Sequence, residues 1–438
     1  MIHPLRGKVQ TVKILHTSDW HLGKKLFRAS RMEEQKLFLQ WLLQTLRQEK
    51  ISLLLISGDI FDSPIPTAEA QETYFQFLKD ATEQTACRIY IISGNHDSGR
   101  FLEAPLPFLR PSRIEVVGRF RQELREHIFC LPFEDKKVGL FLLPHFKISD
   151  LLMHDDADFE CDAILHEHVV LRALERTVIR AKNLLVQQGA NFSILMAHHL
   201  FGNTHYAGSE LFLGLSGLES IPATIFSDKF DYLALGHLHG AQVSSPAPLG
   251  IYPGAPIPLH FGESNRKSVS LLELAGHRDR PEFFQSWKAI PSFRMILSVA
   301  GQAGELAEKL LAALQTHVST LPPFIELRCE GSPIEGADET RLFDIAKEFG
   351  GTILKMSYQT SGHERPEADA PSALASHDFP TSLSLPKVFQ AFHRQKYQGA
   401  EPSEALMQTF LNSLEEWSHA TPAKEMMLTD ENQAAHPS

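Results

Sequence analysis

Short apolar runs alternate with polar turns from Thr11 to about Leu274. The runs are rich in leucine and β-branched residues, as in "VKILHT", "LLLIS", "RIYII", "SILMA" and "DYLALG", and this composition is typical of buried strands. A stretch with apolar residues at helical spacing follows several of these turns. Because strands and helices alternate, we predict an α/β fold in which helices cover the faces of a sheet.

The clearest helix is predicted over residues 33–48. Its apolar positions recur three and four residues apart, which places them on one helical face; they are Leu37, Phe38, Trp41, Leu42 and Leu46. Ser30 precedes this stretch and Glu33 follows three residues later, a spacing typical of a capping box. We therefore expect Ser30 to be the N-cap of this helix.

Five of the turns that follow strands contain side chains that bind metal ions. These side chains are Asp19 and His21, Asp59, Asn95 and His96, His198 and His199, and His237 and His239. Residues two apart on an extended chain point to the same side, so D-x-H and H-x-H can present two ligands together. If the five strands are neighbours in one sheet, the turns lie along one edge and their side chains converge.

Each motif by itself has an ordinary explanation. D-x-H often marks a turn or cap, "GNHD" is typical of a polar turn, and a pair of adjacent histidines is usually at the surface or satisfied in the core. "GHLHG" at 236–240 is more specific, because packing alone rarely requires two histidines and two glycines after a strand. The presence of all five turns in one chain predicts a metal site. Oxygen and imidazole ligands without thiolates favour Mn, Fe, Mg or Zn.

The remainder of the chain divides into four parts after a first domain over residues 1–290. Residues 291–360 alternate strands and helices and predict a small α/β module, whereas residues 361–384 are rich in Pro, Ala and Ser and predict a linker. Two amphipathic helices are predicted over residues 385–420. We expect residues 421–438 to be a disordered tail.

Composition changes this picture little. The chain of 438 residues has a net charge of -11, which neither indicates nor excludes nucleic-acid binding, and its 22 histidines favour metal chemistry. Its four cysteines are widely spaced without a CxxC pair, as suits a reducing cytoplasm. We see no signal peptide and no apolar stretch of membrane-spanning length, and we expect a cytoplasmic protein.

The order of the motifs resembles the calcineurin-like metallophosphoesterase superfamily. The stretches "ILHTSDWHLG", "SGDIFDSPIPTAEA", "SGNHDS" and "YPGAPIPLHFGE" are most similar to its bacterial DNA nuclease subunits. The resemblance is close over residues 1–290, looser over residues 291–360 and loosest in the last helices. It implies a β-sandwich flanked by helices, followed by a small α/β capping domain and by C-terminal helices. The capping domain would contact DNA.

The resemblance also implies a role for each site residue. One Mn ion would be held by Asp19, His21, Asp59 and His239, and a second by Asp59, Asn95, His198 and His237. His199 competes with His198 for this assignment, and Mg is possible in place of Mn. His96 would face the substrate phosphate as a catalytic residue, whereas Asp62 and Asp97 either orient histidines or cap turns.

The activity implied is hydrolysis of DNA at double-strand ends and hairpins, as a 3′ to 5′ exonuclease and single-strand endonuclease. Such nucleases serve DNA repair, recombination and replication at the nucleoid, as homodimers within a heterotetramer with a coiled-coil ATPase. Residues 385–420 would bind that ATPase, although packing on their own chain is the competing account. Arg100, Arg110 and Arg113 are candidates for contacts with the DNA backbone, but a solvated surface explains each equally well.

Two other functions fit parts of the pattern. A phosphoesterase for small phosphodiesters or phosphoproteins would use the same metal site, but it would not require the module and the C-terminal helices. A DNA-end tethering scaffold with a vestigial site would need both, but it would not require an intact ligand set. Nuclease activity is therefore our first hypothesis.

Overall fold

The computed structural model describes residues 11–359 apart from residues 122, 134–135, 148–149, 152–162, 203–219, 278–279, 317, 332–333 and 335, and it also describes residues 393, 402–403 and 406–410. The chain divides into two compact units, Met1–Gly362 and His363–Ser438. The expected linker and tail lie outside the described residues. Of the two predicted C-terminal helices, residues 406–410 are described and helical, and Leu406 N donates to Ser403 Oγ at 3.3 Å.

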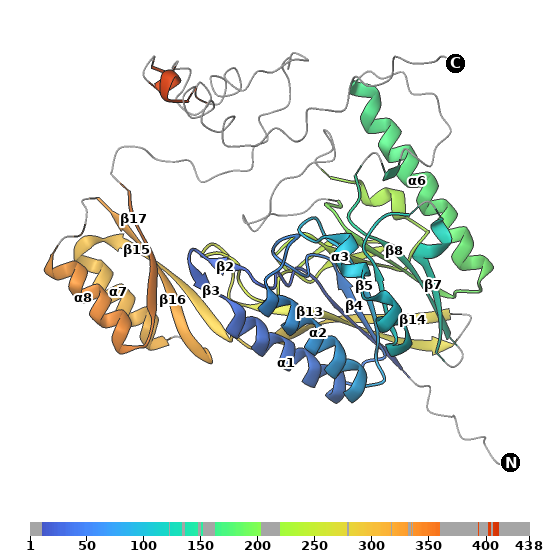
Figure 1. Ribbon diagram of the computed structural model, residues 1–438, viewed down its shortest axis with the longest axis horizontal. Helices are drawn as coiled ribbons and strands as arrows, with labels where there is room; N and C mark the ends of the chain where they lie inside the picture. Colours follow the sequence, from blue (N-terminus) through green and yellow to red (C-terminus); the bar gives the residue numbers. More distant parts are fainter. Residues whose placement is uncertain are drawn as a thin grey trace, which may run out of the picture. The chain divides into compact units, whose positions relative to one another are not determined.

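Two six-stranded sheets form the centre of the first unit (Figure 1). The first has the order β14-β13-β1-β4-β5-β6 and comprises β1 Val12–Thr17, β4 Leu53–Ser57, β5 Arg88–Ile92, β6 Ile114–Val117, β13 Lys267–His277 and β14 Arg280–Ile290. The second has the order β11-β12-β10-β9-β8-β7 and comprises β7 Ile128–Phe133, β8 Lys136–Leu143, β9 Phe192–His198, β10 Tyr232–Gly236, β11 Gln242–Pro246 and β12 Leu249–Tyr252. Strands β1, β4, β5 and β6 are parallel, as are β8, β9 and β10.

Apolar side chains fill three layers of this fold. One core cluster joins the inner faces of the two sheets, and it includes Ile14, Leu55, Leu140 and Met196. Helices α1 Met32–Gln48 and α2 Ala68–Gln84 cover the outer face of the first sheet, and α6 Ala163–Gln187 covers that of the second (Figure 1). The predicted β-sandwich flanked by helices is confirmed, because strands buried on both faces must lie between layers.

The start of α1 differs from the predicted capping box. The helix begins at Met32, and its N-cap is Arg31, which makes no capping hydrogen bond with its side chain. The prediction of Ser30 as the N-cap is therefore wrong. Ser30 instead pairs with Lys25 in a short β-ribbon, which holds its backbone extended, although its Oγ accepts from Met32 N at 3.3 Å. The carboxylate of Glu33 does not reach back to the N-cap because it binds Arg294, at 2.7 Å from Nη2.

Residues 294–359 fold as a three-stranded parallel sheet with two helices. The strands are β15 Arg294–Gln302, β16 Leu321–Glu330 and β17 Thr352–Gln359, and one apolar cluster packs α7 Ala303–Thr316 and α8 Ala337–Glu348 against them (Figure 1). Arg294 joins this module to the sandwich, because it binds Glu33 and Glu34 and lies over the ring of Phe324 at 4.3 Å.

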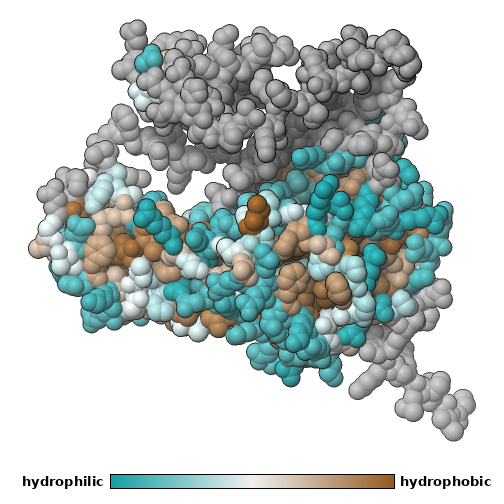
Figure 2. Space-filling model, in the orientation of Figure 1, coloured by the Kyte–Doolittle hydropathy of each residue, from teal (hydrophilic) through white to brown (hydrophobic). Residues whose placement is uncertain are grey.

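The remaining elements are short and connect the main ones. They are β2 Lys25–Leu26, β3 Ala29–Ser30, α3 Gly99–Glu103, α4 Leu106–Leu109, and the single turns η1 Arg110–Ser112, η2 Leu124–His127 and η3 Ala223–Phe226. Figure 2 shows that hydrophilic side chains cover much of the outer surface of α1 and α2. Among the described helices, none is long and apolar enough to cross a membrane.

Candidate metal centre

The predicted site residues lie at the ends of five parallel strands that belong to two facing sheets. Asp19 and His21 follow β1, Asp59 follows β4, and Asn95 and His96 follow β5, all in the first sheet. The last residue of β9 is His198, and His237 directly follows β10, in the second sheet. The five strands are therefore divided between the two sheets of the predicted sandwich, and the carboxyl ends of both sets meet at one edge of it.

The backbone at this edge is strained. Asp19, His21, Asp59 and His237 have φ values of 54°, 46°, 49° and 109°. Residues other than glycine rarely adopt a positive φ, and each one that does raises the free energy of the folded state by on the order of 1–3 kcal/mol. Strain of this kind persists where the surrounding structure fixes it, and here it falls on residues whose side chains turn into the cluster.

Two glycines allow the turns to approach one another. A Cβ on Gly58 would lie 2.3 Å from His198 Nδ1, and Gly58 also has a φ of +84°. A Cβ on Gly94 would lie 2.1 Å from Asp59 Oδ1. Any larger residue at either position would push the strand ends apart, so the two glycines are required for the close packing of the site.

One group of candidate ligands consists of Asp19, His21 and His239. Their ligand atoms all lie within 4.8 Å of one another, and all three side chains are buried. The Nε2 atoms of His21 and His239 are 3.2 Å apart. Two imidazole nitrogens aimed at each other across a buried space can share a cation between their lone pairs.

A second group consists of Asn95, His198 and His237. Asn95 Oδ1 lies 3.2 Å from His198 Nε2 and 3.1 Å from His237 Nδ1. Asp59 lies between the two groups, because its Oδ2 is 3.5 Å from His21 Nε2 and 3.3 Å from His198 Nε2. The ligand atoms of Asp19, Asp59 and His198 also lie within 4.8 Å of one another. The cluster therefore has two adjoining lobes, with Asp59 between them.

The electrostatics of the cluster suit a cation. Burial lowers the pKa of His21 to about 4 and that of His237 to about 3, so both imidazoles stay neutral and keep a lone pair. Burial also opposes the charge of Asp59 and His198, but their mutual attraction lowers the pKa of Asp59 and raises that of His198 to about 9. Burial raises the pKa of Asp19 to about 6.

These oxygen and imidazole donors fit divalent metal ions. A divalent cation in each lobe would compensate the buried carboxylates, whose charge His198 otherwise balances because its pKa is raised.

His198 and His199 point in different directions. His198 turns Nε2 toward Asn95 and Asp59, while its Nδ1 donates to Ser57 O at 2.8 Å. The Nε2 of His199 instead accepts from Phe146 N at 3.2 Å, on the far side of the β9 end. The geometry favours His198 as the ligand.

His96 lies at the rim of the cluster and is partly exposed. Its backbone N donates to Asp59 Oδ1 at 2.9 Å, and its ring lies 4.8 Å from that of His21. Because Nδ1 is 3.0 Å from the carbonyl oxygen of Asp62, which can only accept, Nδ1 carries a proton. This leaves Nε2 as the ring atom available to a substrate.

Asp62 and Asp97 have different contacts. The carboxylate of Asp97 accepts from the backbone N of Gly94, Ile60 and Phe61 at 2.9 to 3.1 Å, so it caps the turns. Asp62 Oδ1 lies 3.3 Å from His21 Nδ1 and accepts from Lys24 Nζ at 2.9 Å. Asp62 therefore contacts a histidine of the cluster, whereas Asp97 supports the backbone.

The three arginines proposed for DNA contacts are exposed but differ in their contacts. Arg100 lies on α3, next to the "GNHD" turn. Arg110 Nε binds Glu115 at 3.0 Å. Arg113 Nη2 donates to the carbonyls of Thr82 and Thr85 at 2.9 and 3.0 Å, at the end of α2. DNA contact by each remains a prediction. Among the described residues, the guanidinium of Arg100 makes neither an ion pair like that of Arg110 nor hydrogen bonds to carbonyls like those of Arg113.

Two buried or partly buried residues at the site were not predicted. His145 follows β8, donates its backbone N to Ser93 O at 3.0 Å and stacks on His199 at 4.6 Å. Its signal was the apolar run that ends in "LLPH", which matches the strand and turn pattern of the other five. Glu263 lies near His239 in an irregular segment, where no strand end or spacing marked it.

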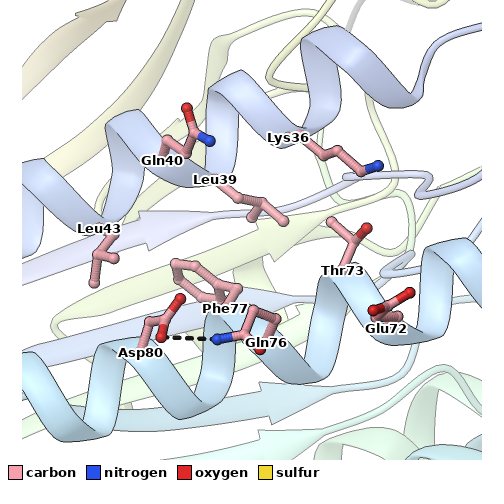
Figure 3. Close-up of a pocket in the computed structure, with 9 residues that line it drawn as sticks. All are labelled: Lys36, Leu39, Gln40, Leu43, Glu72, Thr73, Gln76, Phe77 and Asp80. Carbon is pink, nitrogen blue, oxygen red and sulfur yellow. Dashed lines mark hydrogen bonds between the residues drawn. The ribbon is translucent and has the colours of Figure 1, made fainter.

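The groove between α1 and α2 is separate from this cluster. It has a volume of about 320 Å³, and Figure 3 shows the nine side chains that line it, among them Lys36, Phe77 and Asp80. None of the nine is a candidate metal ligand. The groove therefore does not belong to the metal site.

The comparisons with known proteins agree with this arrangement. The family model for calcineurin-like phosphoesterases matches residues 12–241. The SbcD subunit of nuclease SbcCD from Rhodobacter capsulatus is 30% identical over 383 residues, which cover 84% of this chain and 91% of that protein. The proteins of the same name from Escherichia coli K12 and Bacillus subtilis 168 are 29% and 24% identical; the alignments cover 60% and 91% of this chain, and 64% and 97% of those proteins.

Proposed function

The chain belongs to the calcineurin-like phosphoesterase family, and on that premise we propose that it is a Mn-dependent DNA nuclease of the SbcD type. It would cut DNA at double-strand ends and hairpins during repair, recombination and replication, in the cytoplasm at the nucleoid. It would act as a homodimer with an SbcC-type ATPase, which residues 385–420 would bind. Support comes from the relatives named as SbcD subunits of nuclease SbcCD, whose similarity extends beyond the phosphoesterase domain.

The position of Asp59 carries this proposal. Its Oδ2 lies within 3.5 Å of one histidine from each lobe, as expected of a carboxylate shared by two ions. Asp19, His21 and His239 would hold one ion, and Asn95, His198 and His237 the other. Two divalent ions in this place would polarise a phosphodiester, activate water and neutralise the charge that develops on phosphate.

His96 would move the proton in the reaction. Its Nδ1 is engaged by the carbonyl of Asp62, so Nε2 is the atom that would face the scissile phosphate. A protonated Nε2 would stabilise negative charge on phosphorus or donate to the departing sugar oxygen. Asp97 would support this step indirectly, because it fixes the turn that carries His96.

DNA cleavage by the purified chain tests the proposed function. With Mn²⁺ we expect cleavage of linear duplex and hairpin DNA, stronger when the SbcC-type ATPase of the same genome is added, and none after chelation by EDTA. A chromogenic phosphodiester serves as the comparison substrate. If the chain hydrolysed the diester but left DNA intact, both without and with the ATPase, it would instead be a small-molecule phosphoesterase. Manganese binding with neither reaction would identify a tethering scaffold.

A further inference from the structure

His239 presents its two ring nitrogens to different surroundings. Nε2 lies 3.2 Å from His21 Nε2, inside the first lobe of the metal centre. Nδ1 faces away from the lobe, 3.7 Å from Glu263 Oε1. The side chain of Glu263 is 1% exposed. A buried carboxylate therefore lies behind a candidate ligand, on the side opposite the ion.

Lys267 holds Glu263 in this position. Its Nζ is 2.5 Å from Glu263 Oε2 and donates to the backbone oxygen of His239 at 3.2 Å. Ala255 N donates to the same oxygen at 3.1 Å. The ammonium group compensates the buried carboxylate and also ties it to the backbone of the histidine that it faces. His260 Nε2 lies 3.6 Å from Glu263 Oε1 and shares that oxygen atom with His239.

The segment that carries Glu263 is fixed to its surroundings. Asn265 Nδ2 donates to Ile296 O at 2.8 Å, and Ile296 N donates to Asn265 Oδ1 at 2.9 Å. These two bonds join the segment to β15 of the module. Glu263 N also donates to His260 O at 3.1 Å. Hydrogen bonds therefore hold the backbone on both sides of the Glu263 carboxylate.

The other histidine of the same lobe has a matching arrangement. His21 Nδ1 lies 3.3 Å from Asp62 Oδ1, and Lys24 Nζ binds that oxygen at 2.9 Å. Each histidine of the lobe thus has a carboxylate behind Nδ1 and a lysine behind the carboxylate. A carboxylate in this position keeps the proton on Nδ1 and the lone pair on Nε2, and it fixes the ring orientation.

We propose that Glu263, held by Lys267, is a positioning residue that orients His239 toward the metal ion of the first lobe. The inference rests on the proposed function, because it assumes that this lobe holds an ion. Glu263 acts on one of the two ions, since the second lobe is built from Asn95, His198 and His237. It touches neither substrate nor the reacting atoms.

Manganese titration of the full-length chain tests this role without DNA. By isothermal calorimetry we expect two ions per wild-type chain. Glu263→Ala should weaken one of them about 10 to 100-fold and leave the other unchanged. Asp62→Ala should weaken the same ion. Glu263→Gln should recover part of the loss, because an amide oxygen can take the place of the carboxylate oxygen that faces Nδ1.

The control is Glu49→Ala, which removes a carboxylate bound by Lys13 and Lys288 at 3.0 and 2.8 Å, away from the cluster. Both ions should bind this variant as they bind the wild type. Unchanged binding in Glu263→Ala would overturn the positioning role, and equal weakening of both ions would overturn it in favour of a general structural role. A wild-type chain that binds manganese but leaves DNA intact would overturn the nuclease proposal alone.

Discussion

Asp59→Asn is expected to reduce Mn-dependent cleavage on the order of 10³-fold. The substitution keeps the shape of the side chain but removes the charge that both lobes share at Oδ2. Each ion contributes several kcal/mol to the stabilisation of the transition state, and about 4 kcal/mol corresponds to this loss in rate. Single-turnover cleavage of duplex DNA, with the bound manganese counted by calorimetry, measures both consequences.

A matched control separates this effect from a loss of fold. Asp80→Asn changes a carboxylate in the groove between α1 and α2 (Figure 3), where it accepts from Gln76 Nε2 at 2.9 Å. This variant should cleave and bind manganese like the wild type. If Asp59→Asn kept both ions at wild-type affinity, Asp59 would not be the shared ligand.

Asn95→Ala and His96→Ala should fail in different ways although they are adjacent. Asn95 Oδ1 contacts His198 and His237, so Asn95→Ala should weaken manganese binding in the second lobe. The loss of a ligand should weaken it at least as much as the loss of an outer-shell partner, which is about 10 to 100-fold. His96→Ala should leave both ions bound and slow the chemical step about 10² to 10⁴-fold, as expected for a lost general acid. Calorimetry and single-turnover rates on the same preparations distinguish the two.

The pair also provides its own controls. His96 donates its backbone N to Asp59, and alanine retains that bond, so the turn should stay intact in His96→Ala. Loss of manganese in His96→Ala would make His96 a ligand and would contradict its proposed role. Wild-type affinity in Asn95→Ala would remove Asn95 from the second lobe.

The strands, helices and polar turns could be predicted because their signals are local. The run from Ile89 to Ile92 and the turn that follows it are visible within a few residues. The positions of the strands in two sheets were not visible, because β1 pairs with β4 and with the distant β13. Such pairings depend on tertiary packing and leave no short-range pattern in the sequence.

The unpredicted features of the site likewise depend on tertiary contacts that leave no short-range pattern in the sequence. Glu263 reaches His239 through an irregular segment that is held by Lys267 and by the module, so no spacing in the sequence indicates the contact. The choice between His198 and His199 depended on ring orientation, which their neighbours Ser57 and Phe146 set. Ser30 and Glu33 had the spacing of a capping box, but contacts with Lys25 and Arg294 prevailed.

X-ray diffraction at the manganese absorption edge, from crystals grown with Mn²⁺, tests the central claim most directly. We predict two anomalous peaks on either side of Asp59 Oδ2. One should lie next to His21 and His239, and the other next to Asn95 and His237. An absence of peaks at Asp59, or a single peak that leaves one lobe without an ion, would contradict the two-ion centre.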